Sequence, residues 1–110
     1  MIMITEDYCS FEVAKLLKEK GFDYKGFDYI DFEGEVIRQD RPTHQMAMKW
    51  LREKDIIIII QPEYFNIESK CSAWGVDIWA GDNYEKLQGD FPSYEEAVEA
   101  ALKYSLENLI

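Results

Sequence analysis

Few residues of this chain could do acid–base or nucleophilic chemistry, and their spacing matches no catalytic pattern. The one histidine, His44, directly follows Thr43, which is suited to cap a helix. A histidine in a first helical turn packs or covers backbone amides more often than it acts as a base, and a general base needs a positioned partner. Nucleophile-elbow, phosphate-loop and dinucleotide-binding signatures do not occur. The sequence therefore predicts no catalytic residue, and we expect a protein that is not an enzyme.

The metal-ligating residue types are also badly spaced. The sequence spacing of Cys9, His44 and Cys71 is much wider than that of typical zinc ligands, and no C-x-x-C pair occurs. Carboxylates gather in the second half without fitting the pattern of a calcium loop. They are more typical of solvated turns and strand faces. These carboxylates are Asp77, Asp82, Glu85 and Asp90. The sequence predicts neither a metal site nor a bound cofactor.

The two cysteines are expected to be unpaired thiols. Residues 1–7 contain no basic region and only a short apolar start, which is not typical of a secretory signal. We therefore expect a cytoplasmic protein, and cysteines of cytoplasmic proteins are normally reduced. Neither Cys9 nor Cys71 is expected to be required for function.

The charge of the chain disfavours two classes of partner. The formal net charge is −10 at pH 7, and residues 55–110 contribute most of it, with 11 acids against 3 bases, a net −8. Residues 1–54 hold 11 acids and 9 bases. Direct nucleic-acid binding needs a basic surface, and anionic membranes attract basic segments. We expect neither interaction, and the acidity is most simply explained as an aid to solubility.

Length and hydrophobic patterning predict a single α+β domain over residues 1–110. A chain of 110 residues can bury an independent core. Three segments show helical signals, and strand-like segments lie between them. The expected helices begin at Ser10, Thr43 and Ser93, and the expected strands are 27–32, 35–39, 56–61, 72–80 and, as a short edge, 84–88. The order α-β-β-α-β-β-(β)-α predicts a mostly antiparallel sheet of four to five strands packed by three helices.

Local signals mark the helix ends. Ser10 is suited to the N-cap of the first helix, and Gly21 to the left-handed position that ends it. Ser93 opens an S-x-x-E capping box at the third helix. On that third helix, Glu99 and Lys103 are spaced as an i,i+4 ion pair.

Five consecutive isoleucines, residues 56–60, dominate the predicted sheet. A run of β-branched residues favours a strand, and five residues are too few to span a membrane. Because the run has no polar alternation, it predicts an interior strand covered on both faces, with Trp50, Val98 and Leu102 among its neighbours. If Ile58 is fully buried, its replacement by alanine would cost about 2–5 kcal/mol.

The next strand alternates and presents candidate binding residues. Trp74, Val76 and Ile78 form its natural inward set, so Asp77 and Trp79 face outward. Aromatic residues make up 15% of the chain, which is more than a minimal core needs, and exposed aromatics often mark interfaces. The predicted protein-interaction residues are Asp77, Trp79 and Tyr84 on the sheet, with Tyr64 and Phe65 in the preceding loop.

Three segments resemble a known family. These segments are Met3 to Phe22, Pro42 to Glu53 and Ser93 to Tyr104. They are similar to segments of small uncharacterised proteins encoded in prophage-like and other mobile elements of gut Bacteroides-type bacteria. They cover all three predicted helices, about half of the chain. The resemblance implies an intracellular protein of phage or mobile-element origin and assigns no catalytic residue.

Three functional hypotheses follow from different classes. The first is a non-catalytic protein-interaction module centred on the face with Asp77, Trp79 and Tyr84, whose partner is an unidentified protein or a second copy of this chain. The alternative is an acidic inhibitor that mimics nucleic acid and occupies a DNA-binding protein, favoured by the net −8 of residues 55–110. A small enzyme is the third hypothesis, and no convergent catalytic set supports it.

Overall fold

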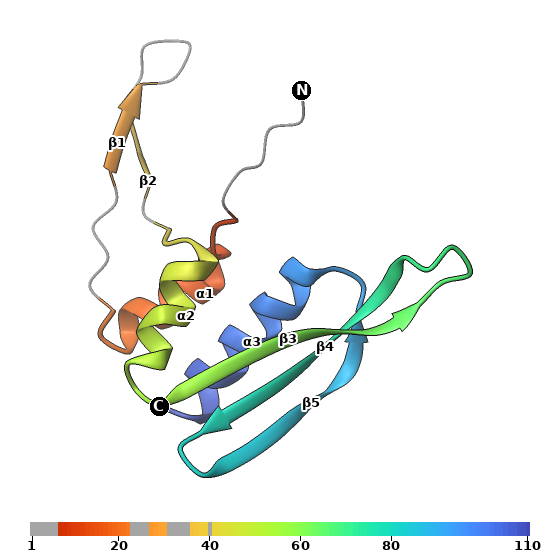
Figure 1. The fold of residues 1–110 in the computed structure, drawn as a ribbon. Helices are drawn as coiled ribbons and strands as arrows, with labels where there is room; N and C mark the ends of the chain where they lie inside the picture. The colour runs from red at the N-terminus through yellow and green to blue at the C-terminus, as the bar shows by residue number, and fades with distance from the viewer. Residues whose placement is uncertain (1–6, 23–26, 31–35, 40) are drawn as a thin grey trace.

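The computed structural model describes residues 7–22, 27–30, 36–39 and 41–110. In Figure 1 the helices of these residues pack beside a twisted sheet, and a hairpin lies apart from that sheet. The elements are α1 (Phe11–Glu19), β1 (Phe27–Ile30), β2 (Val36–Gln39), α2 (His44–Arg52), β3 (Ile56–Phe65), β4 (Cys71–Ala80), β5 (Asn83–Phe91) and α3 (Tyr94–Asn108). This order confirms the predicted α+β class and the predicted succession of helices and strands. Positions 31, 32 and 35 of the predicted strands lie outside the described residues.

The described strands form two sheets. β3, β4 and β5 make an antiparallel meander in the order β3-β4-β5, so β4 is the central strand. β1 and β2 pair antiparallel with each other in a two-stranded sheet of their own. α3 contacts all three strands of the meander and also contacts α1 and α2. α3, with α2 beside β3, therefore covers one face of the meander, and no helix of the described residues lies on the other face (Figure 1).

The hydrophobic core lies between that covered face and the helices. β4 contributes Val76 and Ile78, which are almost completely buried. α3 opposes them with small residues at Ala97 and Ala101, which let the helix approach the sheet closely, and with Leu102. The remaining buried members of the cluster are Cys9, Val13, Leu17, Ala47, Met48, Leu51, Ile56, Val98 and Leu106.

The predicted helix ends are confirmed. The Ser10 hydroxyl accepts a hydrogen bond from the Val13 N–H at 3.2 Å, and the Ser93 side chain caps α3 in the same way. Gly21 has a φ of 101°, and the N–H that follows it, of Phe22, donates to a carbonyl of α1 at 2.9 Å. This is the Schellman ending that a glycine after the helix predicts.

The isoleucine run is an edge strand, so the prediction of an interior strand covered on both faces is wrong. Ile56 is 3% exposed, whereas Ile57 is 46% and Ile59 is 41% exposed. Ile58 and Ile60 are partly buried against the core. The alternation is therefore present in space, but five identical residues conceal it in the sequence. The strand covered most completely is β4, its neighbour.

The two cysteines are free and differ in accessibility. Cys9 is buried and Cys71 is partly exposed. Burial, with a smaller effect from the nearby Glu99 carboxylate, raises the pKa of the Cys9 thiol to about 12. Because the thiolate is the reactive form, Cys9 is expected to be inert in the folded protein.

Alkylation is expected to reveal that difference. Iodoacetamide at neutral pH should modify Cys71 in the native protein and should reach Cys9 only after unfolding in denaturant. Mass spectrometry of peptides from native and denatured samples measures this, with the denatured sample as the control. Equal modification of both thiols in the native protein would show that Cys9 is not enclosed as described.

Candidate interaction surface

The uncovered face of the β3–β4–β5 meander brings together residues from all three strands. The register places Ile57 opposite Trp79, and Trp79 opposite Tyr84, in one row across the sheet. The next row runs from Ile59 through Asp77. We call this surface the open face; its members are Ile57, Ile59, Gln61, Glu63, Asp77, Trp79, Tyr84 and Lys86. It contains the three sheet residues that the sequence predicts for binding.

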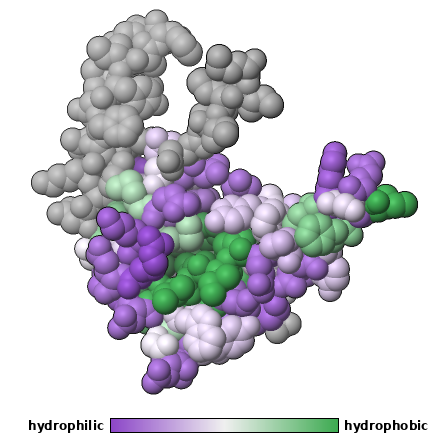
Figure 2. Space-filling model, in the orientation of Figure 1, coloured by the Kyte–Doolittle hydropathy of each residue, from purple (hydrophilic) through white to green (hydrophobic). Residues whose placement is uncertain are grey.

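Apolar and aromatic groups are accessible on this face. Trp79 is 42% exposed, and Tyr84, Ile57 and Ile59 are exposed to a similar extent. The rings of Trp79 and Tyr84 pack against each other with centroids 4.9 Å apart. Figure 2 shows a continuous hydrophobic area over β3 and a second one at the tip of the β3–β4 hairpin. The exposed apolar residues of the first area lie on a strand, which positions them more rigidly than a loop would.

Asp77 lies beneath this surface instead of projecting from it. Its side chain faces outward as predicted, but the residue is only 9% exposed. One carboxylate oxygen accepts a hydrogen bond from the Tyr84 hydroxyl at 2.5 Å, and the other accepts one from Gln61 Nε2 at 2.6 Å. The hydrogen bond to Asp77 raises the pKa of Tyr84, so the phenol stays neutral. Asp77 therefore orients Tyr84, which is itself exposed.

An ion pair fixes the other end of the open face. Lys86 Nζ lies 2.7 Å from Glu63 Oε1 and 3.9 Å from Asp77 Oδ1. The hydrogen bond that Lys86 donates to Glu63 raises the pKa of Lys86, which stays charged. Glu63 crosses β4 at Gly75, where a Cβ would lie 2.0 Å from the Glu63 carboxylate. The glycine thus leaves room for the polar network that surrounds Asp77.

Tyr64 and Phe65 lie elsewhere, at the far end of β3. Both are exposed, and Ile67 at the hairpin tip is fully exposed. Asn66 shapes the tip, because its side-chain oxygen accepts hydrogen bonds from the Glu68 and Lys70 N–H groups. The hairpin extends beyond the helices (Figure 1). The prediction that these two aromatics lie in a loop is wrong, because both belong to β3, and they lie outside the open face.

A cluster that the sequence did not predict joins the three helices around Glu99. Its Oε1 accepts a hydrogen bond from the Ser10 N–H at 2.6 Å and lies 3.0 Å from His44 Nε2, and its Oε2 accepts one from the Ser10 hydroxyl at 3.1 Å. The predicted Glu99–Lys103 pair is wrong, since Lys103 instead lies 2.8 Å from Glu12. The spacing of Glu99 within its helix pointed to a solvated pair and gave no signal for contacts with α1 and α2.

The order of groups in this cluster differs from that of a catalytic triad. In a serine–histidine–acid triad the histidine lies between the hydroxyl and the carboxylate. Here the carboxylate of Glu99 lies between Ser10 and His44. His44 is also buried. The arrangement therefore supports a structural connection between helices.

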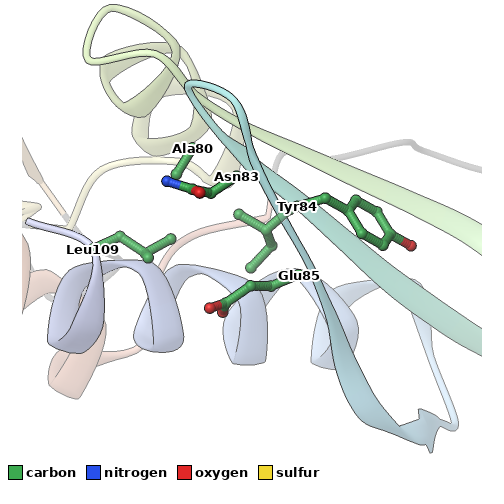
Figure 3. Close-up of a pocket in the computed structure, with 6 residues that line it drawn as sticks. Ala80, Asn83, Tyr84, Glu85 and Leu109 are labelled. Atoms are coloured by element: carbon green, nitrogen blue, oxygen red, sulfur yellow. The ribbon is translucent and has the colours of Figure 1, made fainter.

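A small pocket of about 250 Å³ lies between the β4–β5 turn and the end of α3. In Figure 3, Glu85 points toward α3, whereas Tyr84 points to the opposite side of the sheet. Tyr104 of α3 donates a hydrogen bond to Glu85. The lining residues are Ile78, Ala80, Asn83, Tyr84, Glu85 and Leu109. Ligand pockets usually measure about 300–1,000 Å³ and contain converging polar groups, so we assign no ligand to this one.

Several acids of residues 55–110 are engaged in contacts within the chain. At least five of the 11 accept hydrogen bonds or pair with lysine. These acids are Glu63, Asp77, Glu85, Glu99 and Glu107. A nucleic-acid mimic needs carboxylates free to meet a basic partner. Residues 55–110 therefore offer fewer free carboxylates to a partner than their composition indicates.

Metal-site and membrane-spanning features are both missing from the part of the chain that the structure describes. There, no three side chains of histidine, cysteine, aspartate or glutamate come together as a metal site. The helices of that part also fall short of the length and apolar character needed to cross a bilayer.

Comparison with other proteins finds no match for this chain among family models, curated proteins or solved structures.

Proposed function

We propose that this chain is a non-catalytic protein-interaction module that binds a protein partner through the open face. The observation that carries the proposal is the pair of exposed rings, Trp79 and Tyr84, held on adjacent strands above a buried and hydrogen-bonded Asp77. Tryptophan and tyrosine are enriched among residues that dominate binding energy at protein interfaces. The intracellular setting and the mobile-element origin implied by the resemblance of the helical segments belong to the same proposal.

The rigidity of the face supports this function. The Asp77 carboxylate fixes the Tyr84 hydroxyl, and Gln61 and Lys86 surround that carboxylate. A surface that is ordered before binding loses less conformational entropy when a partner docks. The aromatic pair can therefore contribute its contact area to binding without first having to be ordered.

Replacement of Trp79 by alanine is expected to abolish partner binding and to change thermal stability little. The ring is 42% exposed and lies on the face opposite the core, so its loss leaves the packing of β4 against α3 intact. Wild type and variant are compared by thermal melting and by quantitative affinity capture from a lysate of the native host. The matched control is Ile67→Ala, which truncates an exposed apolar side chain outside the open face.

If the open face binds a protein, the three proteins should differ in what they capture from the lysate. At least one protein should be retained by wild type and by Ile67→Ala and lost with Trp79→Ala. A large fall in melting temperature for Trp79→Ala, without loss of any captured protein, would make Trp79 a structural residue and would contradict the proposal.

A further inference from the structure

The outer edge of β3 carries backbone groups that no described strand pairs. β4 occupies one side of β3, and the three-stranded order leaves the other side as an edge. In an antiparallel ladder, successive residues point their N–H and C=O groups to alternate sides. Gly81 N–H donates to the Asp55 carbonyl at 3.0 Å, so Asp55 points toward β4. The alternation then directs the backbone groups of Ile56, Ile58 and Ile60 away from β4.

The features that normally protect an edge strand begin only beyond this segment. Natural edges carry charges, prolines or bulges that prevent pairing with another chain. In β3 the proline is Pro62, and the register shifts relative to β4 lie between Pro62 and Tyr64 and between Tyr64 and Phe65. At the other end, the left-handed Asp55, with a φ of 62°, terminates the extended backbone. Residues 56–61 are therefore an uncharged strand edge that contains no proline and no register shift.

We propose that this edge pairs with the same edge of a second copy, antiparallel about a two-fold axis at Ile58. That register sets Ile58 opposite Ile58 of the second copy, and Ile56 opposite Ile60. In this register, the residues whose backbone N–H and C=O groups point away from β4 lie opposite the equivalent residues of the second copy. Each unpaired N–H therefore faces an unpaired C=O. The edge is thus self-complementary, as a closed two-fold interface requires. The product is a continuous six-stranded sheet.

The side chains of the open face favour the same partner. In this register Ile57 of one copy lies opposite Ile59 of the other, on the face where both are more than two-fifths exposed. Cross-strand contacts between β-branched side chains stabilise antiparallel pairs. The dimer therefore covers apolar surface that an isolated chain leaves in water.

The charge distribution also fits a second copy. Each chain carries a net −10, yet residues 56–61 contain no charged group, so the two copies meet along a neutral segment.

This inference goes beyond the proposed function and stands without it. The seam lies at β3, whereas Trp79 and Tyr84 belong to β4 and β5. A dimer of this kind would present two copies of the aromatic pair on one sheet. Loss of partner capture by Trp79→Ala leaves the dimer intact, and loss of the dimer leaves Trp79 exposed, so the two proposals fail separately.

Charge-swap variants analysed by sedimentation velocity test the dimer. Wild type is expected at the mass of a dimer. Ile57→Lys/Ile59→Lys should sediment at half that mass, because the register sets like charges opposite each other, and Ile57→Glu/Ile59→Glu should do the same. An equimolar mixture of the two variants should recover the dimer mass. Ile67→Lys, the same substitution at the exposed hairpin tip, should remain a dimer.

Three results would overturn the inference. They are a monomeric wild type across the concentration range of the experiment, lysine variants that remain dimeric, and a mixture of the lysine and glutamate variants that stays monomeric. Both substituted side chains are exposed, so circular dichroism of the variants is expected to match that of wild type.

Discussion

Replacement of Ile78 by alanine is expected to lower the free energy of unfolding by about 2–5 kcal/mol. The side chain is 1% exposed and lies on the central strand β4, where it belongs to the hydrophobic cluster shared with α3. Truncation removes buried methyl and methylene groups and leaves a cavity that the surrounding helices and strands fill only in part. Urea denaturation followed by fluorescence or circular dichroism measures the change, with an unchanged slope indicating that two-state unfolding is retained.

Ile58 supplies a matched control for Ile78. The two residues are direct cross-strand partners with identical side chains, but Ile58 lies on the edge strand and is only partly buried. Its replacement by alanine is expected to cost about 1–2 kcal/mol, since less apolar area is lost from the core. The measurement is made at low protein concentration, so that self-association adds no stability. A loss at Ile58 equal to or larger than that at Ile78 would contradict the placement of β4 at the centre.

Replacement of Glu99 by alanine is expected to cost about 1–3 kcal/mol of stability. The change removes the acceptor of the Ser10 N–H and hydroxyl and the hydrogen-bonding partner of His44. It therefore weakens the connection of α3 to both α1 and α2. Glu107→Ala is the control on the same helix, because that side chain is exposed and pairs loosely with Lys103 at 4.0 Å; its effect should stay within about 0.5 kcal/mol.

The contribution of Glu99 to stability should also depend on pH. Burial alone would raise the pKa of this carboxyl, but the hydrogen bonds from His44 and Ser10 outweigh it and lower the pKa below its usual value. A carboxyl with a lowered pKa in the folded state stabilises the fold above its unfolded pKa, about 4.3 for glutamate, and loses that contribution as the pH falls through the folded pKa.

Unfolding free energies of wild type and Glu99→Gln are expected to converge on acidification. The difference between the two proteins should shrink as the pH falls below about 4.3. Denaturant unfolding over that pH range measures it. A difference that grows on acidification would mean that the folded protein does not stabilise the ionised form of Glu99.

The helices and their ends could be predicted because their signals are local. Ser10, Thr43 and Ser93 each cap a helix through a hydrogen bond to an N–H three residues later, and Gly21 ends α1 within the same few residues. Such contacts depend on sequence neighbours alone. The alternation of β4, with Ile78 inward and Trp79 outward, is local in the same sense and was also predicted correctly.

The position of β3 in the sheet could not be predicted, because it depends on which strands lie beside it. A run of isoleucines is compatible with a strand covered on both faces, and equally with an edge strand whose exposed side chains are apolar. β4 pairs with β3 on one side and with β5 on the other, so β3 becomes an edge strand. The exposed isoleucines are therefore the part of the sequence that departs from a simple inside–outside pattern.

The contacts of the candidate surface and of the helix junction are non-local. Glu99 and Ser10 are 89 positions apart, and Asp77 is 16 positions from Gln61. Composition and spacing identify these side chains as polar residues near apolar ones, but only the fold shows which of them meet. For that reason the sequence indicated Asp77 as a contact residue, whereas the structure places it under Tyr84 as a support.

Site-specific photo-crosslinking in native host cells can show directly whether the open face binds a protein. A photoreactive phenylalanine analogue is placed at Trp79 on the open face and, as the control, at Phe11, which is also exposed but lies on α1. We predict a discrete adduct of this chain with a second protein from position 79 and none from position 11. No adduct from position 79, or the same adducts from both positions, would contradict an interaction surface on the open face.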